Sequence, residues 1–371
     1  MRSLSLFSGA GGMDIGVIQA GFDVLACIEI DPFACETLRS AVLRERRETL
    51  VIEQDIRGID PYDLMLQLNI DSGELDLLFG GPPCQSFSQI GKQLSLEDER
   101  GLLLFEMVRF AEAFQPKAIM IEQVKGLLSA KDSKGVRRGV LEELILQLHN
   151  IGYTLNWKVV LAADYGVPQL RERVFIVGLK NSEKPFNFPE PTHQPHEQSL
   201  FNSPTYVTVG DVLFDLRPPS IKNKAEPPED SHMDVTPAGD RRRIHGVPEG
   251  AWLSSQRQLP AEQIQGLTRK DTTKFRRLAS NEPSITLRGG EIFFHPTEDR
   301  ILTPREYMRI HGYPDSYILK GPIRSRSGRV KYLDQHRQVA NSVPPPLAKA
   351  VATAISRILE CQQSSSFLVT V

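Results

Sequence analysis

The stretch LDLLFGGPPCQSFS, residues 75–88, decides the fold class. Its first five residues are almost all apolar, which is typical of a strand buried on both faces of a parallel sheet. Two glycines, which let a ligand approach the backbone, and two prolines, which stiffen the turn, then end the strand. A strand of this kind delivers the next side chain, Cys84, to the carboxyl edge of the sheet, where open α/β sheets bind their ligands.

Cys84 is therefore a candidate nucleophile, because a thiol at such an edge can attack a bound substrate. The alternative is a buried structural cysteine, since free cysteine is among the most buried residue types. Pro83 before the thiol and the polar Gln85 after it favour the nucleophile.

Apolar runs that predict strands alternate with helical patterns over the first 180 residues. The predicted strands are residues 3–7, 24–30, 50–54, 75–79, 118–122, 155–161 and 174–178. Between them apolar residues repeat at helical spacing, as in Leu103, Met107, Phe110 and Phe114. The alternation predicts an α/β fold, a doubly wound and mostly parallel sheet with helices on both faces.

The composition of the chain changes near Lys184, after which prolines are frequent and the periodicity is weak up to about residue 296. We predict a first domain over residues 1–183 and a smaller, irregular domain over residues 184–300. Residues 301–371 then form a hinge and a segment that returns to the first domain. An amphipathic helix is expected behind Pro344, because proline suits a helix start.

Composition limits the classes of protein to which the chain can belong. It has 371 residues, 40% of them hydrophobic, and a net charge of −2. No apolar run of membrane-spanning length and no signal peptide are present, and four cysteines without metal-ligand spacing suit a reducing, cytoplasmic location. Because the net charge is slightly negative, any nucleic acid would have to bind at local basic patches. One such patch is residues 240–277, which carry nine basic and four acidic side chains. The alternative for this patch is a solvated face.

Three successive strand ends carry side chains that suit an adenosyl ligand. The glycine turn, residues 7–12, follows the first strand and opens a helix, whose N-terminus favours a negative group. Glu29 ends the second strand, where a carboxylate can accept hydrogen bonds from ribose hydroxyls, and Asp55 follows the third, where it can accept from an adenine amino group. Asp14 stands where the dinucleotide fingerprint needs its third glycine, which disfavours a nicotinamide enzyme.

A carboxyl and two guanidinium groups follow the later strands and are expected at the same sheet edge as Cys84. They belong to Glu122, Arg171 and Arg173. The alternative interpretation is a capped or ion-paired carboxylate and a structural salt-bridge network.

Together these segments closely resemble the DNA (cytosine-5)-methyltransferase family. The resemblance covers almost the whole chain apart from about residues 182–283, and its motifs occur in the order of the family. They are Phe7-x-Gly9-x-Gly11-Gly12, Glu29, Asp55, Gly81-Pro82-Pro83-Cys84-Gln85, Glu122-Gln123-Val124, Gln169-x-Arg171-x-Arg173, Leu302-Thr303-x-Arg305-Glu306 and residues 338–345.

The resemblance implies a role for each catalytic residue. Cys84 would attack carbon 6 of cytosine, so that carbon 5 can take the methyl group of S-adenosylmethionine. Glu122 would hydrogen-bond ring nitrogen 3 and the amino group, and Arg173 would hold the ring carbonyl oxygen, with Arg171 supporting the same pocket. A base inside a duplex is out of reach, so the target cytosine must be flipped out.

The resemblance also implies the binding residues. The residues that would bind S-adenosylmethionine are Phe7, Gly9, Ala10, Gly11, Gly12, Glu29, Ile30, Asp55, Ile56, Pro83, Leu103, Asn341 and Ser342. Residues 184–300 would form the target-recognition domain, in which residues 284–290 resemble the flexible recognition loop. The residues that would contact DNA are Gln85, Ser88, Arg276, Arg277, Arg288, Gly289 and Gly290. The alternative for residues 284–290 is an ordinary hairpin.

One position departs from the family pattern. The residue after the catalytic glutamate is usually asparagine, which hydrogen-bonds the loop that carries the cysteine, and here it is Gln123. Glutamine keeps the amide and adds one methylene, so the contact is expected to be reshaped rather than lost.

The expected function is methylation of cytosine within a specific double-stranded DNA sequence by a cytoplasmic, monomeric bacterial or phage enzyme. It would act in a restriction-modification or protective system, with a restriction endonuclease acting separately, and without metal or membrane. One alternative is a tRNA cytosine-5 methyltransferase, but the Cys-Phe-Thr signature of that subgroup is absent from the variable segment. The other is a non-catalytic DNA-binding regulator, which the intact Cys84, Glu122, Arg171 and Arg173 disfavour.

Overall fold

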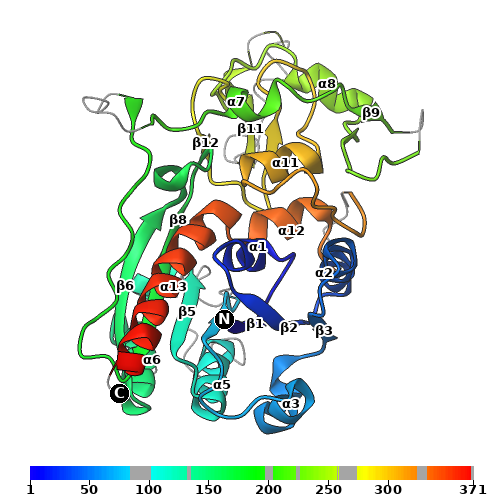
Figure 1. Cartoon of the computed structure of the whole chain (residues 1–371). Coiled ribbons are helices and arrows are strands. Elements are labelled where there is room, and N and C mark those ends of the chain that lie inside the picture. Colours follow the sequence, from blue (N-terminus) through cyan, green and yellow to red (C-terminus); the bar gives the residue numbers. More distant parts are fainter. Residues whose placement is uncertain are drawn as a thin grey trace. The chain divides into compact units, whose positions relative to one another are not determined.

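A computed structural model describes residues 1–83, 102–131, 135–196, 204–222, 226–256, 258, 274–323 and 332–368. The chain divides into two compact units (Figure 1). Unit 1 comprises Met1–Leu161, Glu172–Glu190 and Leu347–Val371, and unit 2 comprises Ala162–Arg171 and Pro191–Pro346. In the described part of the chain, no helix combines the length and the apolar character that crossing a membrane requires.

Unit 1 contains a seven-stranded sheet. Its strands are β1 (Arg2–Leu6), β2 (Asp23–Glu29), β3 (Leu50–Glu53), β4 (Leu77–Gly80), β5 (Ala118–Gln123), β6 (Tyr153–Leu161) and β8 (Glu172–Lys180). Their order is β3-β2-β1-β4-β5-β8-β6, and the pairs from β3 to β5 are parallel, whereas β8 is antiparallel to both neighbours. This arrangement confirms the predicted α/β fold, and each predicted strand matches an observed one to within two residues.

Helices lie between these strands along the chain, and the last helix follows unit 2. They are α1 (Gly12–Gln19), α2 (Pro32–Glu45), α3 (Pro61–Leu68), α5 (Glu106–Phe114), α6 (Gly139–Asn150) and α13 (Pro345–Leu368), with short 3-10 helices η1 (Ile56–Gly58), η2 (Leu102–Phe105) and η3 (Lys125–Ser129). Two of them begin with the same Asp-Pro pair. Asp31 accepts hydrogen bonds from the N–H groups of Phe33 and Ala34, and Asp60 accepts one from Tyr62, so each aspartate caps a helix that proline opens.

The apolar core of unit 1 lies between the sheet and its helices. Side chains of β1, β4, β5 and β8 pack with those of α3, α5 and α6 in one cluster, in which Leu4, Leu78 and Phe110 are fully buried. The predicted helical stripe at Met107, Phe110 and Phe114 therefore belongs to the core. Burial of this apolar surface fixes the strand ends that carry the candidate site.

Unit 2 is irregular. Its strands form two-residue or three-residue pairs, β7 (Gln169–Leu170) with β12 (Ser284–Ile285), β9 (Ser220–Ile221) with β10 (Met233–Asp234), and β11 (Phe275–Arg277) with β13 (Ile292–Phe294). Its helices are α7 (Val209–Leu213), α8 (Ala238–Ile244), α11 (Pro304–Ile310) and α12 (Gln335–Asn341), with 3-10 helices η4 (Ala162–Tyr165) and η6 (Leu253–Ser255). Loops make up much of it, so many backbone carbonyls have no partner in a sheet.

Buried arginines supply those partners. Arg277 donates to the carbonyl oxygens of Ile244, His295, Pro296 and Glu298, and Arg305 donates to those of Asp230 and Tyr317. Arg300 instead forms a doubly hydrogen-bonded ion pair with Glu306, whose side chain caps α11 together with Thr303. Since the planar guanidinium group presents five N–H donors, one arginine can join several loops.

The division into units differs from the predicted boundaries in two places. The short segment Ala162–Arg171 belongs to unit 2, although it lies between two strands of the unit 1 sheet. Residues 301–346 also belong to unit 2, and only the chain from Leu347 onward returns to unit 1. Within unit 2, α11 and α12 pack on each other, and α11 also hydrogen-bonds to other segments of this unit.

Candidate active site

The candidate site of unit 1 lies where the order of the sheet reverses. From β1 the chain proceeds outward through β2 and β3, and it then returns to β4 on the other side of β1. Leu6 at the end of β1 pairs with Gly80 at the end of β4, so the glycine turn and residues 81–83 follow neighbouring strands. In doubly wound sheets this switch point is where ligands bind.

Gly80 is required there by the backbone of the neighbouring strand. A Cβ atom at this position would lie 2.5 Å from the carbonyl oxygen of Leu6, which no side chain tolerates. The glycine thus lets β1 and β4 approach closely at the edge that the sequence analysis assigned to ligands.

The glycine turn is held in an unusual backbone conformation by Glu29. Phe7, Gly9 and Gly11 all have positive φ angles, of 56°, 55° and 75°, and such a conformation is costly for a phenylalanine. Glu29, at the end of β2, accepts hydrogen bonds from the N–H groups of Gly9 at 2.7 Å and of Ile30 and Asp31 at 2.8 Å. Burial raises the pKa of this carboxyl, and these three N–H groups oppose that rise.

The other predicted cofactor residues of unit 1 lie around the same strand ends. Ala10, Gly11 and Gly12 are buried, whereas Ile30 at the end of β2 is 62% exposed, which leaves an apolar surface beside Glu29. Ile56 is buried, Leu103 is half-buried and Pro83 is exposed. Asp55 caps η1 and pairs with Arg57 at 2.6 Å, and this guanidinium hydrogen bond lowers the pKa of the carboxyl.

Asn341 and Ser342 belong to unit 2. Asn341 is the last residue of α12 and is exposed, and the Ser342 hydroxyl donates to the carbonyl oxygen of Val339 at 2.8 Å. Their predicted cofactor contact remains a prediction.

Cys84 lies outside the described residues, as do Gln85 and Ser88. The structure describes the three residues before it and how they are held. The Gln123 amide donates to the carbonyl oxygen of Pro82 at 2.7 Å, and the side chain of Gln123 is fully buried. The longer glutamine therefore makes a contact with the segment leading to Cys84, as the sequence analysis expected for this departure from the family pattern.

Glu122 and Arg173 form an ion pair at the end of β5 and the start of β8. Arg173 Nε lies 2.8 Å from Glu122 Oε1, and their side chains are only 13% and 11% exposed. The other carboxylate oxygen of Glu122 faces Gly81, where a Cβ atom would lie 3.1 Å from it. The structure thus brings together Glu122, Arg173 and the backbone that leads to Cys84.

Arg171 belongs to unit 2 and is 1% exposed. Its guanidinium donates to the carbonyl oxygens of Leu287, Ala340 and Ser342. The predicted role of Arg171 in one pocket with Glu122 and Arg173 remains a prediction.

The predicted DNA-contacting residues differ in exposure. Arg277 is buried and bound to four carbonyl oxygens and to Asp299, so it cannot reach a phosphate without breaking these bonds. Arg276 is half-buried and stacks on Trp252, and Arg288 is exposed and pairs with Glu291. We therefore replace the DNA contact predicted for Arg277 by a structural role.

The remaining basic and glycine residues of that prediction are only partly described. Gly289 and Gly290 are exposed, and a Cβ atom at Gly290 would meet nothing within 4 Å. Arg257, Arg269 and Lys270 of the basic patch lie outside the described residues.

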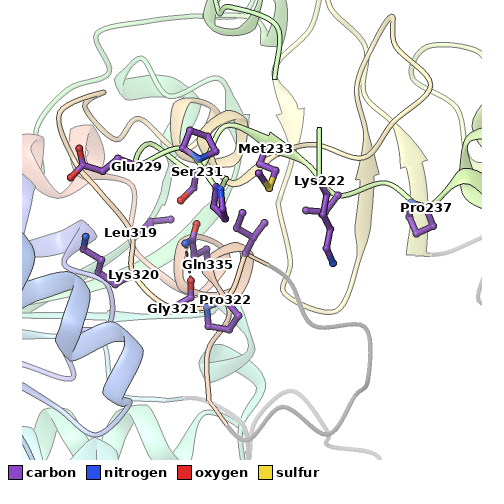
Figure 2. A pocket seen from close by; sticks show the side chains of 14 residues that line it. Lys222, Glu229, Ser231, Met233, Pro237, Leu319, Lys320, Gly321, Pro322 and Gln335 are labelled. Atoms are coloured by element: carbon purple, nitrogen blue, oxygen red, sulfur yellow. Dashed lines mark hydrogen bonds between the residues drawn. The ribbon is translucent and has the colours of Figure 1, made fainter. Parts of the chain in front are cut away.

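Unit 2 also contains a cavity of about 790 Å³ (Figure 2). Its walls combine apolar side chains such as Met233 and Ile323 with Lys222, Lys320 and Gln335. None of the predicted catalytic and cofactor residues that the structure describes lines it. Among the described residues, no cluster of three or more histidine, cysteine, aspartate or glutamate side chains could hold a metal ion.

Sequence reasoning missed a polar group buried beneath the glycine turn. Asp14, in the first turn of α1, is 4% exposed and accepts a hydrogen bond from the thiol of Cys27 at 3.2 Å. Burial raises the pKa of Asp14 from 3.8 to about 6. The position of Asp14 in a pattern of small and apolar residues could have indicated this burial.

An Asp14→Asn variant should be more stable than the wild type at pH 7–8 and equally stable near pH 3. Between pH 3.8 and about 6 the folded protein holds a proton that the unfolded chain releases, so the free energy of unfolding falls as the pH rises through this interval. Over the whole interval the wild type loses at most about 3 kcal/mol of unfolding free energy. Urea unfolding at several pH values measures it, with Asp60→Asn, at an exposed helix cap, as the control. Parallel pH profiles for the wild type and Asp14→Asn would contradict the assignment.

The comparisons with known proteins point to one family. The family model of the C-5 cytosine-specific DNA methylases matches residues 1–357. The Type II methyltransferase M.NgoFVII of Neisseria gonorrhoeae is 33% identical over 96% of this chain and 87% of its own length. The Type II methyltransferase M.PspPI of Psychrobacter is 34% identical over 98% of this chain and 81% of its own length.

A solved structure shows the same fold. It is a prophage-encoded protein of E. coli described as a DNA modification methyltransferase, with a TM-score of 0.69 and 23% identity over 97% of this chain and 99% of that one. The match of the family model over nearly the whole chain, with relatives above 30% identity of similar length, decides the family. The chain belongs to the C-5 cytosine-specific DNA methylases.

Proposed function

We propose that this DNA (cytosine-5) methyltransferase uses S-adenosylmethionine to methylate cytosine in one specific sequence of double-stranded DNA, through a covalent intermediate at Cys84. The observation that carries the proposal is the meeting of three features at one sheet edge. These are the glycine turn after β1, residues 81–83 after β4, and the Glu122–Arg173 pair at β5 and β8. As a group they offer a cofactor site, a nucleophile and an acid beside it.

The residues around the glycine turn fit an adenosyl group. Glu29 uses its two oxygens for three N–H groups, and a carboxylate has about four acceptor positions, so one remains for a ribose hydroxyl. Ile30 offers an exposed apolar surface next to it for a flat base. S-adenosylmethionine, when bound, supplies a methyl group on a sulfonium, which a carbon nucleophile can take.

The chemistry of the substrate requires the protein to activate carbon 5. Addition of the Cys84 thiolate to carbon 6 would make carbon 5 an enamine carbon, which then takes the methyl group. Glu122 would hydrogen-bond nitrogen 3 and the amino group, and so stabilise the negative charge that the attack places on the ring. Loss of the proton from carbon 5 and of Cys84 from carbon 6 then restores the aromatic ring.

Arg173 has a second task in this mechanism. Its ion pair with Glu122 holds the carboxyl in place before substrate arrives, since both side chains are nearly buried. When the cytosine enters, Arg173 would donate to the ring carbonyl oxygen, which lies next to nitrogen 3. A buried ion pair thus orients the group that acts on the base.

A Glu29→Ala variant should bind S-adenosylhomocysteine more weakly by about 1.5–3 kcal/mol, because charge-assisted hydrogen bonds and the support of the glycine turn are lost. Titration calorimetry measures the change. Glu53→Ala is the matched control, since Glu53 lies at the end of β3 and pairs with Arg39 on the surface. Equal affinity of the Glu29 variant and the wild type would remove Glu29 from the cofactor site.

The Type II names of the relatives support a role as the modification enzyme of a restriction-modification system, with the nuclease as a separate protein. Expression in a bacterium without its own methyltransferases, followed by bisulfite sequencing of the genome, tests the function. We expect 5-methylcytosine at nearly every copy of one short sequence. Methylated tRNA with unmethylated DNA would favour the tRNA enzyme, and no methylation at all would favour the non-catalytic regulator.

A further inference from the structure

Strand β7 pairs with the start of the recognition loop, residues 284–290. Gln169 and Leu170 of β7 pair in parallel with Ser284 and Ile285 of β12. The Thr286 hydroxyl also donates to the carbonyl oxygen of Leu170 at 3.0 Å. The first half of the loop is therefore joined to β7 through backbone contacts.

The second half of the loop is held by side chains. Gln169 accepts from the N–H of Leu287 at 3.1 Å, and Arg171 donates to the carbonyl oxygen of Leu287 at 3.3 Å. Both backbone groups of this residue are thus bound by the Gln169-x-Arg171 motif, and Leu287 itself is fully buried. Leu287 directly precedes Arg288, Gly289 and Gly290, the exposed end of the loop.

The same two side chains also bind the end of α12. Arg171 donates to the carbonyl oxygens of Ala340 at 3.0 Å and Ser342 at 2.9 Å. Gln169 Nε2 lies 3.0 Å from His311 Nδ1, and His311 Nε2 lies 3.0 Å from the carbonyl oxygen of Ser342. Because Gln169 Nε2 can only donate, His311 must accept at Nδ1 and donate at Nε2.

These bonds form a closed network. Gln169, Arg171 and His311 are each at most 1% exposed. They connect one residue of the recognition loop, Leu287, to the segment 340–342 that leads into α13. A buried hydrogen-bonded network of this kind resists rearrangement, because breaking one of its bonds leaves a buried polar group unsatisfied.

We propose that Gln169 and Arg171 are positioning residues that fix the recognition loop and thereby set DNA sequence discrimination. This inference rests on the proposed function and deepens it. The exposed residues 288–290 include two glycines, so the loop by itself has many conformations. An anchor at Leu287 limits them, and an error of about 1 Å in the placement of a base-reading group is enough to lose a directed hydrogen bond.

This role differs from a catalytic one for Arg171. The guanidinium is buried and already donates to three carbonyl oxygens, so a cytosine ring cannot approach it in this structure. Arg173, two residues further, carries the contact with Glu122 instead. Within residues 169–173, the first residues therefore bind the recognition loop, and the last residue, Arg173, binds the Glu122 carboxylate.

The test compares the methylation rates at the cognate sequence and at sequences that differ by one base pair. The first variant is Arg171→Lys, which keeps the positive charge but loses the planar guanidinium group with its several N–H donors. The second is Gln169→Glu, which keeps an acceptor for the N–H of Leu287 but loses the amide donor to His311. Arg305→Lys is the matched control, because Arg305 is equally buried in unit 2 and donates to Asp230 and Tyr317, away from the loop. Unfolding temperature and S-adenosylhomocysteine affinity are measured for all of them.

We expect both motif variants to lower the ratio of cognate to altered-site kcat/KM by about tenfold, within the range of one base contact. Covalent capture of 5-fluorocytosine at the cognate site should persist. Arg305→Lys should lower the unfolding temperature and leave the ratio unchanged. Should Arg171→Lys not fold, Thr286→Val, which removes only the bond to Leu170, should lower the ratio in the same direction.

An unchanged ratio in the motif variants and in Thr286→Val would overturn the inference. Equal loss of methylation at all sequences, with no covalent capture, would also overturn it and assign Arg171 to the catalytic pocket. Failure of the proposed function is distinguishable, since the wild type would then methylate no DNA at all.

Discussion

A Cys84→Ser variant should form no covalent adduct with duplex DNA that carries 5-fluorocytosine in the recognition sequence, whereas the wild type should form a denaturation-resistant one. Fluorine at carbon 5 cannot leave as a proton does, so the enzyme stays bound to carbon 6 after methyl transfer. A serine hydroxyl is far less ionised than a thiol at neutral pH and has no base assigned to it here. Methylation of normal DNA should fall by at least about a thousandfold, as for loss of other covalent nucleophiles.

The segment before Cys84 explains why this position should be reactive. Its approach is fixed by Gly80 against β1 and by the hydrogen bond from Gln123 to Pro82. Gly81 is three residues before Cys84 in the chain, and the Glu122 carboxylate lies beside Gly81. Cys361→Ser is the matched control, because this thiol is exposed on α13 and should not affect capture. Capture by the Cys84→Ser variant, seen as a shifted band under denaturing conditions, would exclude Cys84 as the nucleophile.

An Arg277→Met variant should lose about 3–5 kcal/mol of unfolding free energy, which is the cost of removing one partner from a buried charged network. Four carbonyl oxygens and the Asp299 carboxylate would lose their donor together. Methionine keeps most of the volume, so the loss reports hydrogen bonds more than packing. Urea unfolding followed by fluorescence measures it.

The controls separate this structural role from DNA binding. Arg288→Ala changes an exposed arginine and should alter stability by less than about 0.5 kcal/mol. Arg276→Ala should weaken DNA binding with little effect on sequence preference if this side chain contacts phosphate. Unchanged stability of Arg277→Met, together with weaker DNA binding, would restore the DNA contact that the sequence analysis predicted.

The strands of unit 1 were predictable because their signal is local. A run such as residues 75–79 is apolar except at Asp76, and burial on both faces of a parallel sheet favours that pattern. The glycines and prolines that end β4 mark the boundary in the same way. The position of Glu122 beside Gly81 followed from the strand order, since parallel neighbours end at one edge.

Unit 2 was not predictable at the same level. The sequence shows nine basic residues from 240 to 277, but it does not show which of them is buried. Arg277 finds its partners 18 to 33 residues away, at Ile244 and His295 among others, and such contacts leave no periodic pattern. Irregular loops fix their backbone through individual side chains, so each contact depends on the complete fold.

Arg171 and Arg173 illustrate the limit within the site itself. The resemblance to the family implied one pocket for both side chains. Strand β8 begins only at Glu172, and Arg171 lies between β7 and β8 and belongs to unit 2. The boundary between the two units thus falls between these two arginines, and no local pattern in the sequence marks it.

The discontinuity of unit 1 has a consequence for the newly made chain. All seven strands of its sheet have been synthesised at Lys180, but α13, with the fully buried Leu347, Val351 and Ile355, follows only after unit 2. At about 5–20 residues per second this interval is on the order of ten seconds or more. During that time apolar surface that α13 will cover is open to chaperones or to other nascent chains. A premature stop anywhere in unit 2 would therefore yield an aggregating fragment rather than a smaller working enzyme.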